Sequence, residues 1–392
     1  MCGRRLAPCR AACPVSPVAR ERTMIGGLAL GGRAIRLWAG ASTPASAMRP
    51  MIMRREHQES GRSDASGHAP ERSRGPLAQA LSRGRVRILR NPRSRRNLGR
   101  EPGTGWPGIE VVAPPRRSDT AAALAHCHAA GTDCLIIDGG DGTIRDVLTA
   151  GAAVFGSAWP ALAVLPRGKT NALANDLRLP RHWGVPEVLA AVRAEQTVLR
   201  HPLLLQRVGA PADTVLGFIV GAGTFASGIE AAQSAHQMGM FGDLAVGATL
   251  AWSVVRVIAG RGNTAWREGS GMTVTLPGGE RLVHRGGGDT NRRSLLVATT
   301  LRRLPLGLRP FGPERAGLKL LVVDRASRAI YAAAPLLLAG ALPGWLTARG
   351  VHRLDPGEVE LICDSAIVLD GDILPPGHWR ISTGPALEFV AG

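Results

Sequence analysis

The segment Cys134–Thr143 reads CLIIDGGDGT and joins a short apolar run to three glycines. The apolar run Cys134–Ile137 is typical of a strand that is buried on both faces of a parallel sheet. A helical pattern follows from about residue 144 to residue 150. Glycines between a strand and a helix let the backbone approach a polyanion closely, and two of them can adopt positive φ. The segment therefore predicts a phosphate-binding loop made of Gly139, Gly140, Asp141, Gly142 and Thr143.

The two polar side chains of this loop suggest different tasks. Asp141 is negative and is unsuited to touching a phosphate, so we expect it to hold Mg²⁺ through water or to order the amides of the loop. Thr143 can cap the following helix or donate a hydrogen bond to a phosphate oxygen.

Two other loops have the same strand-then-loop pattern. LPRGKTN follows the apolar run Ala161–Leu165, and NPRS follows the strand-like run Val86–Leu89. Loops at the carboxyl ends of neighbouring parallel strands converge on one crevice. The predicted nucleotide-binding residues of these loops are Asn91, Ser94, Gly168, Lys169, Thr170 and Asn171.

The pattern of apolar runs changes near residue 200. Between residues 84 and 200, strand-like and helical runs alternate, which favours an α/β nucleotide-binding domain. From residue 201 to residue 372, strand-like runs follow one another with few helices between them, which indicates a second, β-rich domain. Two helical patterns interrupt it, at 244–259 and 329–342. The second is shorter than a bilayer span, so we expect a core helix, with shallow docking on a membrane as the alternative.

The chain has 392 residues, and its 48 Lys and Arg exceed its 30 Asp and Glu, which gives a formal net charge of +18. Residues 1–80 are rich in Arg, Ala, Ser, Gly and Pro and show no sustained periodicity, which predicts a disordered basic extension. An apolar run at 24–37 is interrupted by Arg33 and Arg36, which argues against a signal peptide. No helix-turn-helix, zinc-finger or RNA-binding signature is found, so nucleic acid is not expected as a partner.

Taken together, the motifs NPxS, GGDGT and LPxGxxN resemble the diacylglycerol kinase catalytic-domain family, which includes soluble bacterial lipid kinases and sphingosine kinases. The resemblance runs from about residue 84 to the C-terminus and includes the glycine-containing strand end at 221–224. Asp370-Gly371-Asp372 is similar to the Asp-Gly-Glu of the family. By this resemblance Asp372 is the general base, with Asp370 beside it as a second catalytic residue.

The resemblance implies an α/β N-terminal domain, a C-terminal β-sandwich domain, and a tail at 373–392 that returns to the first domain. It implies ATP and Mg²⁺ as cofactors and transfer of the γ-phosphate to a lipid hydroxyl, most simply that of diacylglycerol. We expect a cytoplasmic protein that meets its lipid substrate at a membrane surface, peripherally at the inner face. The lipid acceptor and the oligomeric state stay open.

Four departures from the family pattern are visible in the sequence. Lys169 stands where the family has Thr, and Arg95 replaces a Gly after Ser94. Asp372 is one methylene shorter than the usual Glu. The run Arg315–Gly317 replaces an Asp-Asp-Gly that is associated with an accessory magnesium site, so that site is not expected here.

Two other functions remain open at this point. An NAD kinase shares the GGDGT loop, but no counterpart of its second glycine-threonine-serine motif is found. A nucleotide-binding regulatory protein without catalysis is the other alternative, because Asp372 and the altered loop at Lys169 depart from the catalytic pattern.

Overall fold

The computed structural model describes residues 75–98, 106–180, 182–224 and 269–392. The basic extension up to residue 74, the apolar run at 24–37 and the helical pattern at 244–259 lie outside these residues. Ordered structure was expected to begin near Gly84, but a short helix, α1 (Pro76–Ser82), precedes that residue. Ala78 and Ala80 of this helix are buried, so the helix belongs to the folded part of the chain.

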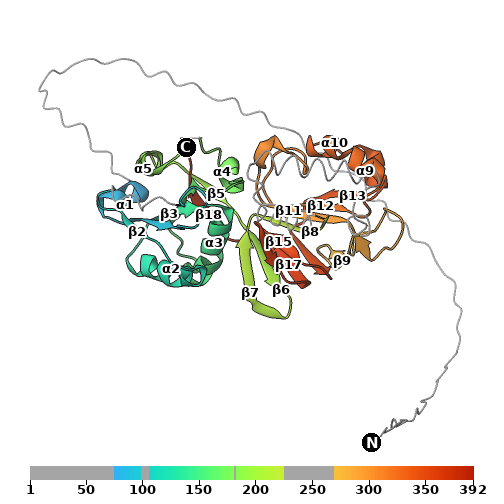
Figure 1. The fold of residues 1–392 in the computed structure, drawn as a ribbon, viewed down its shortest axis with the longest axis horizontal. Coiled ribbons are helices and arrows are strands. Elements are labelled where there is room, and N and C mark those ends of the chain that lie inside the picture. The colour runs from blue at the N-terminus through green and yellow to red at the C-terminus, as the bar shows by residue number, and fades with distance from the viewer. Residues whose placement is uncertain (1–74, 99–105, 181, 225–268) are drawn as a thin grey trace, which may run out of the picture. The chain divides into compact units, whose positions relative to one another are not determined.

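The loops of interest extend from a mixed sheet of six strands (Figure 1). Its spatial order is β2 (Glu110–Val112), β1 (Val86–Arg90), β3 (Cys134–Gly139), β4 (Ala161–Pro166), β18 (Leu387–Val390) and β5 (Thr197–Arg200). All neighbours pair in parallel except β18 and β5, which are antiparallel. The carboxyl ends of β1, β3 and β4 therefore lie at the same edge of the sheet.

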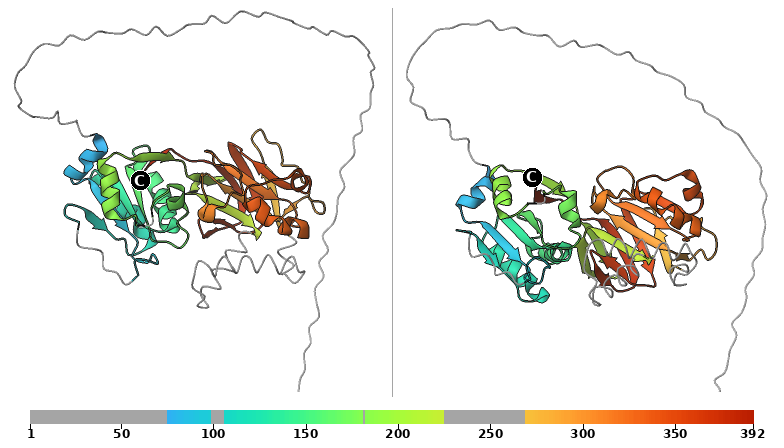
Figure 2. Two further views of the ribbon diagram at one scale, coloured as in Figure 1. Left: turned by 90° about the horizontal axis from the view of Figure 1, so that it is seen from above. Right: turned by 45° about the horizontal axis from the view of Figure 1, so that its top comes forward.

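Helices cover both faces of this sheet, as the further views in Figure 2 also show. Side chains alternate along β3: Leu135 and Ile137 pack in one core cluster with α2 (Thr120–Ala129) and α3 (Asp141–Phe155). Ile136 packs in the other cluster with α1 and α5 (Val185–Arg193). This double burial explains why β3 is apolar throughout. A 3-10 turn, η1 (Arg117–Asp119), leads into α2, and α4 (Ala172–Asp176) follows β4.

After β5 the described residues form two antiparallel sheets of six strands each. The first contains β10 (Arg292–Arg293), β9 (Ser270–Thr275), β14 (Glu358–Cys363), β17 (Gly377–Thr383), β6 (Leu203–Arg207) and β7 (Ala210–Gly217). The second contains β13 (Val351–Leu354), β12 (Lys319–Val323), β11 (Leu295–Thr299), β8 (Ile219–Gly223), β15 (Ile367–Leu369) and β16 (Asp372–Leu374). Apolar side chains from both sheets share one core, among them Leu205 and Leu361 from the first and Val220 and Leu296 from the second.

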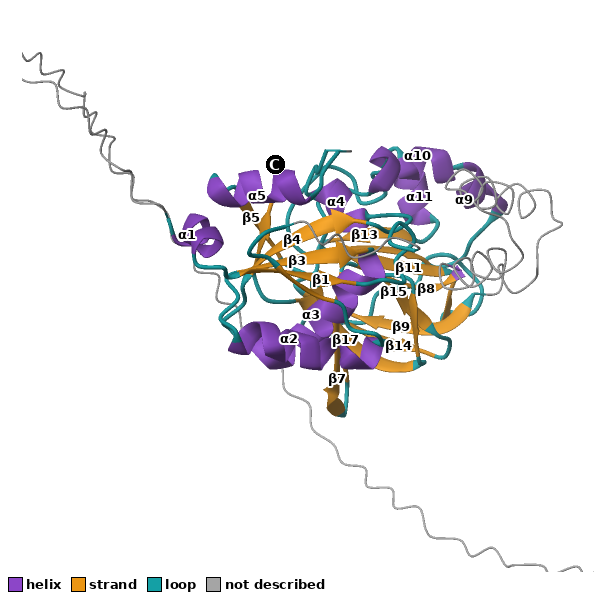
Figure 3. Ribbon diagram, turned by 60° about the vertical axis from the view of Figure 1, so that its left-hand side comes forward, coloured by secondary structure: helices purple, strands orange, loops and turns teal. Residues whose placement is uncertain are grey.

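Two element predictions need correction in this region. Among the strand-like runs expected after residue 201, the run 214–220 has the pattern of a single strand, but the chain changes sheets at Phe218, between β7 and β8. The run 329–342 was expected to be one helix, but it forms α9 (Arg328–Ala332) and α10 (Ala334–Leu338). Pro335 lies in the first turn of α10, and proline cannot continue a preceding helix because it lacks an N–H and clashes with the previous turn. These helices and α11 (Gly344–Ala348) lie near β13 (Figure 3), and η2 (Pro305–Gly307) precedes β12.

The C-terminal tail is divided between the sheets. β16 and β17 pair within the two antiparallel sheets, and only β18 joins the sheet of β1, β3 and β4. Among the residues that the structure describes, no helix is both long and apolar enough to cross a bilayer.

Candidate active site

The loops after β1 and β3 meet through side-chain hydrogen bonds. Asn91 follows β1, and its amide nitrogen donates to Thr143 Oγ1 over 2.8 Å. Ser94 Oγ lies 3.5 Å from the same hydroxyl. The Asn91 side chain is held in place because its oxygen accepts from the Arg93 backbone N–H at 2.9 Å. The structure thus brings together Asn91, Ser94 and Thr143, which the sequence had placed on two separate loops.

The loops after β3 and β4 meet backbone to backbone. A Cβ added to Gly140 would lie 2.7 Å from the Gly168 Cα, and one added to Gly168 would lie 2.8 Å from the Gly140 Cα. A Cβ added to Gly139 would lie 2.5 Å from the Thr143 Cβ. None of Gly139, Gly140 and Gly142 has a positive φ, contrary to the expectation for two of them. Gly139 and Gly140 are therefore required for space and not for backbone conformation.

The loop after β4 is closed by its own asparagine. Asn171 adopts a left-handed φ of 49°. Its side-chain oxygen accepts from the Gly168 N–H at 2.8 Å, and its amide nitrogen donates to the Gly168 carbonyl at 3.1 Å. Lys169 and Thr170 are exposed at the tip of the loop. In this structure the Gly168 amide is thus used within the loop, while Lys169 and Thr170 face solvent.

A buried ion cluster joins the ends of the three strands. Asp138 is 3% exposed, and its two oxygens contact Arg90 Nη1 at 3.2 Å and Arg167 Nε at 3.0 Å. Asn97, also buried, donates to the backbone carbonyls of Asn91 and Asp138. Sequence reasoning did not assign these groups a role. The signal that could have found them is an aspartate at the end of an otherwise apolar strand, since a buried carboxylate needs a partner.

Asp141 lies at the start of α3 and faces the start of α4. Its carboxylate accepts from the Leu173 N–H at 3.5 Å. Burial raises the pKa of Asp141, and hydrogen bonds from backbone N–H groups of Leu173, Ala172 and Asn171 oppose that shift. Across the described residues there is no group of three or more His, Cys, Asp or Glu side chains that could hold a metal ion. The Asp141 carboxylate thus contacts backbone N–H groups at the start of α4, and its role toward Mg²⁺ stays a prediction.

Asp370 holds the junction between β7 and β8. Its two oxygens accept from the Phe218 N–H at 2.8 Å and the Ile219 N–H at 2.9 Å. Gly217 leaves room for it, because a Cβ there would lie 2.5 Å from the Asp370 carboxylate. Burial raises the pKa of Asp370 to about 7, and the nearby negative charge of Asp141 adds to that shift. The Asp370 carboxylate is thus turned toward the backbone.

Asp372 is held by two arginines from the α/β part of the chain. Its Oδ2 lies 2.9 Å from Arg117 Nη2 and 3.3 Å from Arg145 Nη1. Arg145 is 6% exposed and also donates to the Leu369 carbonyl at 3.3 Å. Both arginines contact Asp146 as well. Arg145 and Asp146 lie on α3 two and three positions after Thr143, so this network connects Asp372 to the helix that begins in the glycine loop. Sequence reasoning missed Arg117, Arg145 and Asp146.

A pocket of about 200 Å³ opens beside this network. It contains apolar surface from Leu89 and from the prolines that follow β2, together with basic and hydroxyl groups. The full lining is Leu89, Asn91, Arg93, Pro114, Pro115, Arg116, Arg117, Thr120, Thr143 and Asp146. The pocket thus joins residues of the first two loops to Arg117, which contacts Asp372, whereas Gly168, Lys169, Thr170 and Asn171 do not line it.

The chain is similar to a known sequence family, to a curated protein and to several solved structures. Residues 107–200 match the family described as Diacylglycerol kinase catalytic domain. A stretch of 72 residues is 38% identical to "Probable lipid kinase YegS" from Escherichia coli O17:K52:H18 (strain UMN026 / ExPEC). That stretch covers 18% of this chain and only 24% of the length of the relative.

Solved structures extend the similarity beyond the matched segment. A putative diacylglycerol kinase from Bacillus anthracis str. Sterne superposes with a TM-score of 0.53 at 14% identity, over 79% of this chain and 97% of that protein. A second structure of a diacylglycerol kinase from the same organism gives a TM-score of 0.50 at 13% identity, over the same shares of the two chains. At this identity the likeness shows the fold alone. Residues 107–200 are therefore similar to the diacylglycerol kinase catalytic-domain family, and the chain has the fold of the bacterial diacylglycerol kinase structures.

Proposed function

We propose that this chain is an ATP-dependent lipid kinase that transfers the γ-phosphate to a lipid hydroxyl at the cytoplasmic face of a membrane, with diacylglycerol as the first acceptor to test. The observation that carries the proposal is the contact between Asp372 and Arg145. It connects a carboxylate from β16 to the residue that lies two positions after Thr143 on α3. A carboxylate beside a phosphate-binding loop is the arrangement that phosphorylation of a hydroxyl needs.

The residues around the glycine loop fit a nucleotide. The free N–H groups and the positive end of the helix dipole at the start of the 15-residue α3 favour a phosphate at Gly140 to Thr143. A Cβ at Gly140 would fill the space in which this loop approaches Gly168, and a Cβ at Gly139 would collide with Thr143 in the same loop. In the adjoining pocket, Leu89, Pro114 and Pro115 offer apolar surface for a base, and Arg93 and Arg116 offer positive charge.

We expect Mg²⁺ to bind together with ATP and not at a separate site on the protein. Mg²⁺ is commonly bound through one or two carboxylates together with substrate phosphates and water. Asp141 is the one predicted ligand, and its carboxylate is engaged by backbone N–H groups of α4. The residues described by the structure therefore do not form a dedicated cation site. An ion that accompanies ATP would neutralise phosphate charge.

In the proposed reaction the acceptor oxygen forms a bond to the γ-phosphorus while the bond from that phosphorus to the β,γ-bridging oxygen breaks. The hydroxyl proton passes to Asp372, and ADP leaves with the bonding electrons on its terminal oxygen. Such a transfer passes through a loose transition state, so positioning of the hydroxyl matters more than strong basicity. Arg117 and Arg145 hold Asp372 through Oδ2, which fixes the direction of the carboxylate. Asp370 supports the same turn from the β7–β8 junction.

One observation favours the alternative of a nucleotide-binding protein without catalysis. Asp372 contacts two arginines at once, and an acceptor hydroxyl would have to share the carboxylate with them. In that case the chain would bind ATP and leave it intact with every acceptor.

The test compares ATP consumption by the full chain in three parallel reactions, with diacylglycerol in detergent micelles, with NAD, and with no acceptor. The proposal predicts ADP formation with diacylglycerol and formation of a phosphorylated lipid in equal amount. ADP formation only with NAD would assign the chain to the NAD kinases. ATP binding without consumption in any of the reactions would favour the non-catalytic alternative.

A further inference from the structure

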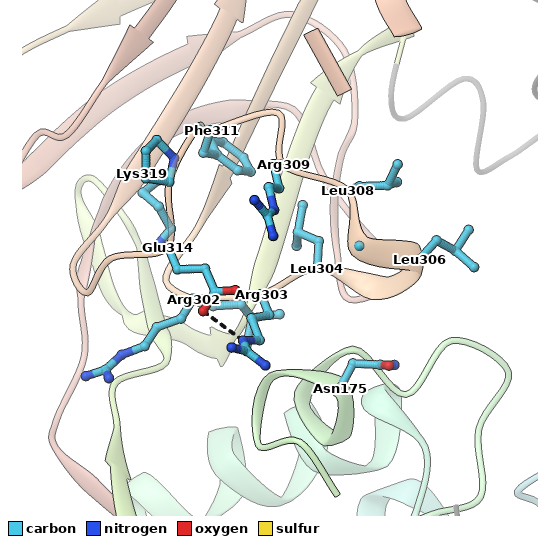
Figure 4. Close-up of a pocket in the computed structure, with 14 residues that line it drawn as sticks. Asn175, Arg302, Arg303, Leu304, Leu306, Leu308, Arg309, Phe311, Glu314 and Lys319 are labelled. Carbon is cyan, nitrogen blue, oxygen red and sulfur yellow. Dashed lines mark hydrogen bonds and ion pairs between the residues drawn. The ribbon is translucent and has the colours of Figure 1, made fainter. Parts of the chain in front are cut away.

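A second, larger pocket lies between α4 and the segment that connects β11 to β12. Its volume is about 330 Å³, and its lining includes Asn175 of α4, most of the residues between 301 and 314, and Lys319 (Figure 4). Four basic side chains line it against a single acidic one. They are Arg302, Arg303, Arg309 and Lys319, opposed by Glu314. This excess of positive charge suits an anionic ligand.

Two of the four basic groups are already engaged. Arg303 Nε contacts Glu314 at 2.8 Å. The buried ammonium of Lys319 donates to the carbonyls of Thr300, Arg315 and Gly317 at 3.3, 3.2 and 2.9 Å. Arg302 and Arg309 are exposed, and neither forms an ion pair within the described part of the chain. These two guanidinium groups are therefore the ones that can meet an external anion.

Leu306 protrudes from the same segment into solvent. It is 91% exposed, and Figure 4 shows its side chain pointing away from the other labelled residues. Its backbone adopts a left-handed conformation with φ of 60° and ψ of 14°. That conformation costs an L-residue other than glycine or asparagine about 1 kcal/mol. The combination of an almost fully exposed leucine and a strained backbone makes Leu306 a candidate for a contact outside the folded chain.

Neighbouring leucines enlarge this apolar tip. Leu308 is 36% exposed and Leu338, at the end of α10, is 40% exposed. The segments that carry these two leucines are adjacent, because the Arg309 N–H donates to the Leu338 carbonyl over 2.7 Å. We call this set of Leu306, Leu308, Leu338, Arg302 and Arg309 the Leu306 surface.

We propose that the Leu306 surface docks on an anionic lipid bilayer, with Leu306 and Leu308 inserted at the level of the lipid headgroups and Arg302 and Arg309 paired with lipid phosphates. Two attractions hold a protein at such an interface: burial of apolar side chains and pairing of basic side chains with anionic headgroups. The leucines can provide the first and the arginines the second. A soluble phosphate would engage the arginines but would leave the leucines in water. A bilayer satisfies both.

The position of this surface gives the docking a purpose, which rests on the proposed function. Arg303 donates its backbone N–H to Asp176 Oδ1 at 2.8 Å, which connects the segment to α4. α4 begins directly after Asn171, the last residue of the loop that contacts Gly140. Docking through Leu306 would therefore hold the candidate active site close to a lipid acceptor.

The test is co-flotation of the full chain with vesicles of phosphatidylcholine alone or with added phosphatidylglycerol. We expect binding to the anionic vesicles and little binding to phosphatidylcholine. Leu306→Asn should weaken binding about fivefold, through loss of buried apolar area. Because asparagine tolerates the left-handed conformation, this variant should unfold at the same temperature as the native chain or a higher one. Arg302→Gln and Arg309→Gln should each weaken binding about fivefold as well.

Matched controls are Leu199→Asn and Arg193→Gln, which change an exposed leucine and an exposed arginine elsewhere. Both should bind like the native chain. Equal flotation of the native chain and all three test variants would overturn the proposal. Phosphorylation of short-chain diacylglycerol in detergent micelles separates this result from the proposed function. Variants that lose flotation but still phosphorylate the short-chain lipid support both the docking surface and the kinase function. Loss of flotation in a chain that shows no kinase activity would support the docking surface and contradict the proposed function.

Discussion

Gly140 and Gly168 contact each other backbone to backbone, at a separation that admits no side chain on either residue. This contact joins the loops that follow β3 and β4 at the edge of the sheet where Asn91 and Thr143 also meet. The geometry of the candidate phosphate site thus depends on two glycines from different loops.

We predict that Gly140→Ala separates the two loops and weakens ATP binding. A Cβ at this position would lie 2.7 Å from the Gly168 Cα, and overpacking of this kind costs about 1–3 kcal/mol of folding free energy. Gly142→Ala is the matched control, because nothing lies within 4 Å of its added Cβ and it lies in the first turn of α3. Thermal unfolding should show a lower melting temperature for Gly140→Ala only. Equal melting temperatures would show that the contact has no energetic weight.

Thr143→Val should reduce both stability and ATP affinity. The variant removes the hydroxyl that accepts from Asn91, and a lost neutral hydrogen bond of this kind costs about 1 kcal/mol. Thr143→Ser keeps the hydroxyl and serves as the control. Titration calorimetry with ATP should place the serine variant near the native chain and the valine variant well below it. If serine and valine weaken binding alike, the hydroxyl is not the group that matters.

Asp138→Asn should strongly destabilise the fold. It removes the charge that is shared by Arg90 and Arg167, and breaking a buried ion pair costs about 3–5 kcal/mol. The exposed pair of Arg85 and Asp133 provides a comparison, since Asp133→Asn should cost only about 0–1 kcal/mol. Urea unfolding measures both free energies. A small effect of Asp138→Asn would mean that the cluster does not hold the strand ends together.

The raised pKa of Asp370 predicts a pH dependence of stability. Its folded-state pKa of about 7 lies above the ordinary value of 3.8, so the folded protein keeps this proton where the unfolded chain has lost it. The contribution of this group is therefore fully present below about pH 4 and is lost as the pH rises to about 7. The Asp370→Asn variant should show a flatter stability profile between pH 5 and pH 8 in urea unfolding. An unchanged profile would assign the pH dependence to other groups.

The sequence predicted β1, β3 and β4 well because their signals are local, whereas β5 and β18 of the same sheet were not predicted as strands. The apolar run before the glycine loop requires burial on both faces, and β3 is buried along its whole length. The extent of α3 was underestimated, since its first turn is the glycine loop itself and glycines hide a helical pattern. The separation of β7 from β8 was missed because an apolar run does not reveal where a chain passes from one sheet to another.

The candidate site could be predicted only in part. The motifs identified Asn91, Thr143 and Asp372, but their partners depend on contacts between distant segments. Arg117 and Asp372, for example, are separated by 255 positions in the chain. Gly168 was expected to bind nucleotide and Asp370 to take part in catalysis. In the structure the Gly168 N–H donates to the Asn171 side chain, and the Asp370 carboxylate accepts from the Phe218 N–H. The sequence pattern does not show whether such a polar group binds a ligand or another group of the protein.

The most direct test of the proposed function is turnover by Asp372→Asn, measured as ADP formation with diacylglycerol micelles beside ATP binding. Asp213→Asn, an exposed aspartate on β7, is the control for the same chemical change. We predict that Asp372→Asn lowers turnover at least about 100-fold, the usual contribution of a positioned acid or base, while ATP affinity stays within about twofold. Native turnover in Asp372→Asn would contradict the assignment of this carboxylate as the group that receives the proton of the acceptor.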